Sequence, residues 1–215
     1  MASRQTTNDR RARIEQMRRA EQAHERRNRI ITISVSALVV AGLVGFGAFV
    51  LNKKSEEKEQ EVAAAKAPIE DEQSWDAKKL TNKHVKTQVK YPMKPPVGGD
   101  HNEVWMNCNG DVYKEAVPDM NAVHSLEHGA VWVTYTDKVS KADVDKLGDR
   151  VKSTPYSLMS PYKDQKGAIM LSAWGKQVAV DSADDPRVGQ FFTKYVNGPQ
   201  TPEKGAACTG GLSGE

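Results

Sequence analysis

The chain has only two cysteines among its 215 residues, Cys108 and Cys208. Two cysteines are too few for a disulfide-rich scaffold or for a cysteine-rich metal cluster, so both classes are excluded. A single bridge is the most that they can form. The sequence also lacks a glycine-rich phosphate loop, a nucleotide-binding fingerprint and a nucleophile elbow, which argues against the enzyme classes that these motifs define.

An excess of charge of one sign is missing from most of the chain. The formal net charge is +3, but residues 1–29 hold nine arginines against four acidic residues, which leaves a net charge of −2 for the rest. This basic tail contains no aromatic side chain that could stack on a base, so we expect no binding to nucleic acid. We expect it to lie beside a membrane, held near anionic lipid.

One long hydrophobic run is present, at residues 30–51. Its 22 residues carry no charge, and a helix of that length covers about 33 Å, enough to cross a bilayer. The run predicts a single transmembrane helix, with residues 1–29 in the cytoplasm by the positive-inside rule and the chain from about residue 52 outside. Cleavage near residues 63–65 would release a soluble form, an alternative that the sequence leaves open.

The rest of the chain divides into a linker and a domain. Residues 52–89 are mostly polar and predict a stalk and linker, whereas residues 90–215 have the composition of a globular domain. We expect an α+β fold, a small sandwich of two helices on one face of a mainly antiparallel sheet. The expected strands cover residues 131–135, 156–160, 168–174 and 177–181, and the expected helices cover residues 140–152 and 186–197.

The segment that most suggests chemistry is residues 124–129, His-Ser-Leu-Glu-His-Gly. On a strand its two histidines would lie about 13 Å apart, whereas on a helical turn residues four apart are neighbours, and Glu127 shares their face. The segment therefore predicts a turn of helix or a tight loop, with Gly129 as its stop. His101, on an earlier loop, could join His124 and His128 around one metal ion.

The fourth position of such a site is open in the sequence. It could be filled by Glu127, by a water molecule, or by the sulfur of Met106, Met120 or Met159. Histidines with methionine would suit copper, and three histidines with an open position would suit zinc. We set aside His84, which lies in the linker, and His24, which lies in the tail. In the alternative, the histidines only hydrogen-bond the backbone in a polar core, and Glu127 completes that network.

Residues 124–128 also fit His-x-x-Glu-His, the inverted zinc-protease signature, in which Glu127 would be the general base. That chemistry needs a continuing helix and a third ligand on another helix, yet Gly129 and a β-rich run follow at once. We therefore favour a non-catalytic protein and keep a small metal-dependent hydrolase as an alternative.

The two cysteines lie outside the membrane in this topology, where disulfides persist. A bridge between Cys108 and Cys208 would fix the glycine-rich C-terminal region beside the loop that carries Met106. In the alternative, Cys108 is a thiolate ligand near the histidines and Cys208 is free.

Residues from about 90 to 208 resemble the actinobacterial membrane-anchored proteins that carry the domain of unknown function DUF3105. The matching positions are Pro95-Pro96, Gly99, His101, Val123-His124-x-Leu126-Glu127-His128-Gly129, Ala173-Trp174-Gly175 and Pro202-Glu203. Gly98 and Asp100 depart from the family pattern, in which Ser and Pro are usual. The resemblance implies a single-pass protein with its domain outside the cytoplasm, and it implies no activity.

Together these features predict a membrane-tethered domain that binds copper or zinc through His101, His124, His128 and Glu127. Its expected location is the cell membrane, anchored in lipid by residues 30–51 and the basic tail. A cell-envelope interaction or structural domain without a metal is the main alternative. The sequence does not identify a protein partner.

Overall fold

The structure is a computed structural model that describes residues 67–214 continuously, with residues 17–19, 25–27, 29, 42–43, 46–47, 49 and 53. The chain forms two compact units, residues 1–58 and 59–215. Among the described residues, no helix combines the length and apolar character that crossing a membrane requires. The predicted span at residues 30–51 and the basic tail lie mostly outside the described residues, so both remain predictions.

The second unit is built on one six-stranded sheet with the order β1-β6-β5-β3-β4-β2. The strands are β1 (Gln73–Ser74), β2 (Asn109–Val112), β3 (Val131–Tyr135), β4 (Ser157–Pro161), β5 (Ile169–Ala173) and β6 (Lys176–Val180). The helices are α2 (Asp119–Glu127), α3 (Lys141–Lys152) and α4 (Pro186–Tyr195). The sheet is mixed, because β3 and β2 both pair with β4 in parallel while the other neighbours are antiparallel.

Helices α3 and α4 cover one face of the sheet. Ser140 caps α3 by accepting a hydrogen bond from the backbone N–H of Asp143, and Pro186 occupies the first turn of α4, where its missing N–H costs nothing. Alternate side chains of β3 point to this face, and Val131 and Val133 pack there in a continuous apolar cluster with residues of α3, α4, β4, β5 and β6. This cluster is the main hydrophobic core.

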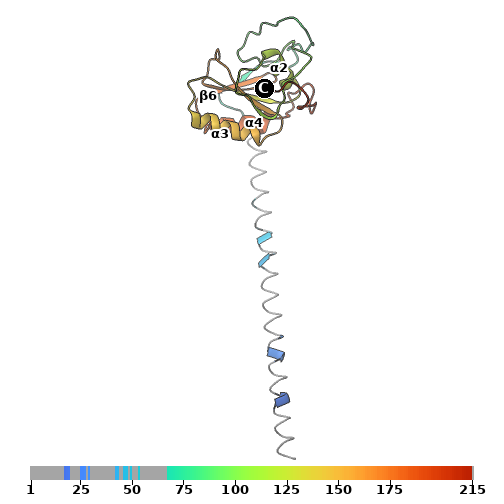
Figure 1. Cartoon of the computed structure of the whole chain (residues 1–215), viewed down its shortest axis with the longest axis vertical. Helices are drawn as coiled ribbons and strands as arrows, with labels where there is room; N and C mark the ends of the chain where they lie inside the picture. The colour runs from blue at the N-terminus through green and yellow to red at the C-terminus, as the bar shows by residue number, and fades with distance from the viewer. Residues whose placement is uncertain are drawn as a thin grey trace, which may run out of the picture. The chain divides into compact units, whose positions relative to one another are not determined.

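Helix α2 covers the opposite face, and Figure 1 shows it across the strands from α3 and α4. Trp132, which alternates with the two valines of β3, packs there in a second cluster with Leu126 of α2 and with Leu158 of β4. Cys108 and Cys208 form a disulfide within this cluster, which confirms the predicted bridge and excludes the thiolate alternative. The bridge fixes the C-terminal segment beside α2.

The predicted α+β class is correct, and its finer description needs two corrections. The sheet is mixed rather than mainly antiparallel, since β2 and β4 extend it in parallel. The two predicted helices do share one face, but α2 adds a third helix on the other. Residues 67–89, predicted as linker, pack on the domain: Ile69 is buried and β1 pairs with β6.

Candidate metal centre

Helix α2 supplies two of the candidate ligands and ends at the site. Its spacing brings His124, Glu127 and His128 to the end of the helix, as positions three and four apart require. The helix stops because Gly129 adopts φ 110°, and the N–H groups of Gly129 and Ala130 donate to Leu126 O and Ser125 O. This is a Schellman ending, for which glycine is favoured.

Two further histidines come from a pair of loop segments that run together. The N–H of Val85 donates to His101 O at 2.7 Å, and the N–H of His101 donates to Lys83 O at 3.0 Å. These bonds form an isolated parallel bridge between His84 and His101. Both imidazoles are thereby held beside α2.

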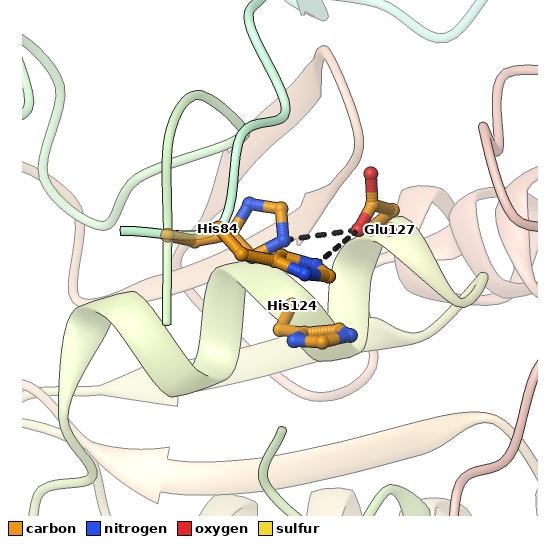
Figure 2. A group of neighbouring side chains, drawn as sticks. His84, His124 and Glu127 are labelled. Carbon is orange, nitrogen blue, oxygen red and sulfur yellow. Dashed lines mark ion pairs between the residues drawn. The ribbon is translucent and has the colours of Figure 1, made fainter. Parts of the chain in front are cut away.

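The side chains of His84, His124 and Glu127 converge (Figure 2), and the side chain of His101 belongs to the same group. One donor atom from each lies within 4.8 Å of every other, and a group of this kind can hold a metal ion. The rings of His84 and His124 stack with centroids 4.7 Å apart, and the ring of His101 lies 4.9 Å from that of His124. His101, His124 and Glu127 are buried, whereas the side chain of His84 is 45% exposed.

The three buried histidines are oriented in the same way by backbone carbonyl groups. A carbonyl can only accept a hydrogen bond, so each Nδ1 carries a proton and each Nε2 has its lone pair available when the ring is neutral. This arrangement of an Nδ1–H bound to a carbonyl is the usual support of a metal-ligating histidine. The bonds are His101 to Gly99 O at 2.8 Å, His124 to Asn102 O at 2.7 Å and His128 to Ala207 O at 2.6 Å.

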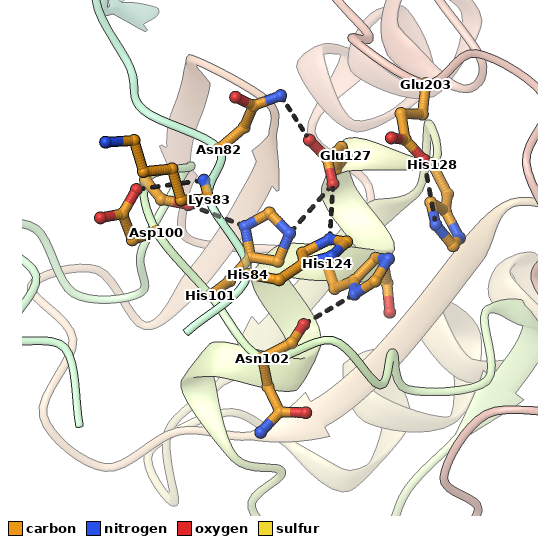
Figure 3. Close-up of polar contacts among 12 residues, drawn as sticks. Asn82, Lys83, His84, Asp100, His101, Asn102, His124, Glu127, His128 and Glu203 are labelled. Carbon is orange, nitrogen blue, oxygen red and sulfur yellow. Dashed lines mark hydrogen bonds and ion pairs between the residues drawn. The ribbon is translucent and has the colours of Figure 1, made fainter. Parts of the chain in front are cut away.

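Glu127 lies at the centre of these contacts (Figure 3). Its Oε1 accepts a hydrogen bond from Asn82 Nδ2 at 2.9 Å, while its Oε2 lies 2.9 Å from His101 Nε2 and 3.7 Å from His84 Nε2. His101 Nε2 and Glu127 Oε2 are both buried, and neither makes an aligned hydrogen bond. Two buried donor atoms that face each other in this way suit an ion bound between them.

The electrostatics of the site separate its histidines into two kinds. Burial lowers the pKa of His124 to about 4, and burial also lowers the pKa of His128. Burial would lower the pKa of His101 as well, but contacts with the Glu127 carboxylate and the Gly99 carbonyl outweigh it and raise that pKa. For Glu127, contacts with His101 and Asn82 outweigh burial and lower the pKa. His124 therefore offers a neutral ring at neutral pH.

His128 lies beside this group without belonging to it. Its ring centroid is 4.4 Å from that of His124, and its Nε2 is 3.8 Å from Oε2 of Glu203. Figure 3 shows His128 and Glu203 across Glu127 from His84 and His101. The ring of Trp105 lies 5.1 Å from His128 and 5.6 Å from His124. His128 and Trp105 thus form one wall of the site.

Sequence reasoning missed His84 and the supporting residues Asn82 and Asn102. His84 was set aside because it lies in the predicted linker, and that reason is wrong, since the bridge to His101 brings the linker to the site. The sequence did contain a signal, because four of the chain's five histidines lie within residues 84–128. Among the methionines considered as ligands, Met159 packs in the core on the opposite face of the sheet.

Comparisons with known proteins give one finding. A family model described as protein of unknown function (DUF3105) matches residues 83–210. Neither the curated proteins nor the solved structures contain a match. The matched range begins directly before His84 and includes all four residues of the convergent group.

Proposed function

This chain belongs to the DUF3105 family, a family of unknown function, and we propose that its domain binds one zinc or copper(II) ion through His84, His101, His124 and Glu127. The observation that carries the proposal is the convergence of four donor atoms within 4.8 Å, three of them on buried side chains. Imidazole and carboxylate donors suit these two ions. Cys108 and Cys208 are joined to each other and supply no thiolate.

The contact distances fit an ion of this size. Two ligand atoms at about 2.0–2.1 Å from one tetrahedral zinc ion lie about 3.3 Å apart. The separations of Glu127 Oε2 from the two neighbouring Nε2 atoms are 2.9 and 3.7 Å, one on each side of that value. Contacts with Glu127 and the Gly99 carbonyl outweigh burial and raise the pKa of His101, so a metal ion at its Nε2 competes with a proton and binding should weaken as pH falls.

The role that we propose is binding rather than catalysis. In the His-x-x-Glu-His hydrolases both histidines hold the ion and the glutamate acts as the base. Here Glu127 lies inside the convergent group and His128 lies outside it, which is the reverse arrangement. A carboxylate that fills the fourth position leaves no open position for a reacting water.

We propose that the domain works outside the cytoplasm, tethered by residues 30–51. The 22-residue uncharged run and the arginine-rich segment before it support the tether and its orientation. The Cys108–Cys208 disulfide supports an oxidising compartment. The proposed contacts with the membrane are those of the span and of the basic tail with anionic lipid.

The test is metal stoichiometry of the full-length chain. After dialysis against chelator, the chain is titrated with Zn²⁺ or Cu²⁺, and bound metal is measured by elemental analysis. We expect one ion per chain, and we expect His124→Ala to weaken binding at least about 100-fold, which is about 2.7 kcal/mol. His24→Ala is the matched control, because it removes a histidine of the N-terminal tail.

Two outcomes would remove the proposal: no stoichiometric binding, or full affinity in His124→Ala. Bound metal should also raise the melting temperature of the wild-type chain and not that of His124→Ala, because a ligand of the folded state stabilises it. Equal melting temperatures with and without metal would instead favour a domain whose histidines only order the fold.

A further inference from the structure

The contact between His128 and Glu203 brings together two side chains of kinds that can bind a metal ion, and neither is among the four proposed ligands. The side chain of His128 is 4% exposed, and its Nε2 faces Glu203 Oε2 at 3.8 Å, while Glu203 is 51% exposed. His128 Nδ1 is bound to Ala207 O, so the lone pair of Nε2 points away from that carbonyl. The pair therefore has one member exposed to solvent, Glu203, and one buried member, His128, which lies beside the four-ligand group.

The loop that carries Glu203 is held firmly over the end of α2. The N–H of Glu203 donates to Glu127 O at 3.0 Å, and the N–H of Gly205 donates to His128 O at 3.3 Å. The disulfide at Cys208 anchors the same loop one residue beyond Ala207. The Glu203 carboxylate is therefore kept beside the ring of His128, next to the rest of the site.

The electrostatics on the two sides of the centre differ. His84, the exposed ligand, lies in residues 77–99, which contain six lysines and no acidic residue. On the other side, the C-terminal end of α2 carries partial negative charge, and Glu203 adds a full one beside Lys204. Asp100 and Glu103 offset part of the lysine charge on the His84 side. On the other side Glu203 places a carboxylate 3.8 Å from His128 Nε2, so a divalent cation is attracted more strongly there.

We propose that His128 and Glu203 are an exchange site, a transient position through which a divalent ion passes between solvent and the buried centre. The proposal rests on the proposed function of that centre and gives His128 a role that the four ligands leave open. The ring of His128 lies 4.4 Å from that of His124, so the ion moves from one imidazole to the next. A position occupied only in passing lowers the barrier in both directions and leaves the affinity unchanged.

The test is the kinetics of zinc exchange in the full-length chain. Association is followed by stopped flow with Zn²⁺ and a zinc-sensitive dye, and release is followed by capture with excess chromogenic chelator. We expect Glu203→Gln to slow association and release alike, each by at least about tenfold, with the equilibrium affinity changed by less than about threefold. His128→Asn, which keeps an N–H group for Ala207 O and removes Nε2, should do the same.

Glu103→Gln is the matched control. Glu103 is an exposed carboxylate that pairs with Lys86 at 4.0 Å, in the lysine-rich region near His84. It should leave both rates unchanged. Slower exchange in Glu103→Gln equal to that in Glu203→Gln would overturn the proposal, because charge alone would then explain the effect.

Two further results would also overturn it. Unchanged rates in Glu203→Gln would mean that the ion passes on the His84 side. If Glu203→Gln slowed association but not release, Glu203 would only attract the cation electrostatically and would not be a position that the ion occupies. A wild-type chain that binds no zinc would instead remove the proposed function itself, so the two failures are distinguishable.

Discussion

The two faces of the sheet are covered by different chemistry, although the same strand, β3, contributes to both. Under α3 and α4, Val131 and Val133 pack in the large apolar cluster. Under α2, Trp132 and Thr134 are equally buried, but the layer above them also buries three histidines, Glu127 and the disulfide. Burial on the first face stabilises the fold through apolar area, whereas burial on the second orients polar groups at a desolvation cost.

The comparison predicts that stability and metal affinity can be changed separately. Phe191 of α4 is fully buried in the apolar cluster. Phe191→Ala should lower the free energy of unfolding by about 3–5 kcal/mol, because it removes a large apolar side chain and leaves a cavity. Denaturant titration of the metal-free, full-length chain measures this loss.

The same variant should keep its zinc affinity, since the apolar cluster, as far as the structure describes it, contains none of the four proposed ligands. Val112→Ala, on the exposed end of β2, is the control and should change stability by less than about 0.5 kcal/mol. If Phe191→Ala weakened zinc binding in proportion to its loss of stability, the two faces would not be independent.

The sequence predicted the elements of the apolar face closely. The expected strands at residues 131–135, 156–160, 168–174 and 177–181 have ends within one residue of those of β3, β4, β5 and β6. The expected helices at residues 140–152 and 186–197 have ends within two residues of those of α3 and α4. The spacing of apolar residues along a strand or a helix indicates which side chains will be buried. These elements can therefore be predicted without knowing which segments pack against them. The cap Ser140 and the first-turn proline Pro186 marked where the helices begin.

The site face was harder to predict, because its contacts are made between distant backbone segments. The bridge between His84 and His101 joins two loops that have no apolar periodicity, so nothing local indicates that they meet. Strand β2 has the sequence Asn-Gly-Asp-Val, which is poor in strand formers, and it was not predicted. The ending of α2 at Gly129 was predicted, since that signal is local.

The two faces should also differ in how much they make the stability of the fold depend on pH, because the titrating histidines lie on the α2 face. The pKa of His124 is about 4 in the folded chain, below its ordinary value of 6.5, so between these pH values the unfolded chain binds a proton that the folded chain does not. The stability of the metal-free chain should therefore fall as pH decreases from 6.5 to 4, by about 1.4 kcal/mol per unit and on the order of 3 kcal/mol in total. His128 acts in the same direction, because its pKa is also lowered.

His101 acts in the opposite direction, because its raised pKa gives stability that is present at low pH and is lost as pH rises through the folded value. His124→Asn isolates one contribution, since asparagine keeps an N–H group for Asn102 O and does not titrate. Denaturation curves between pH 4.5 and 7.5 should show a smaller slope with pH in this variant. Phe191→Ala should show the wild-type slope at a lower stability, and an equally reduced slope in both variants would contradict the assignment to His124.

The smallest predicted effect concerns Asn82, which orients a ligand without being one. Its Nδ2 donates to Glu127 Oε1 at 2.9 Å and so turns Oε2 toward the two Nε2 atoms. Asn82→Ala should weaken zinc binding about tenfold, as loss of a supporting hydrogen bond to a ligand does. Gln88→Ala is the control, because the side-chain amide of Gln88 donates to Val89 O, next to it in the chain, and is not part of the convergent group. Zinc titration of both variants decides: equal affinities would mean that Glu127 is held by the fold of α2 alone, and that the exposed segment adds only His84.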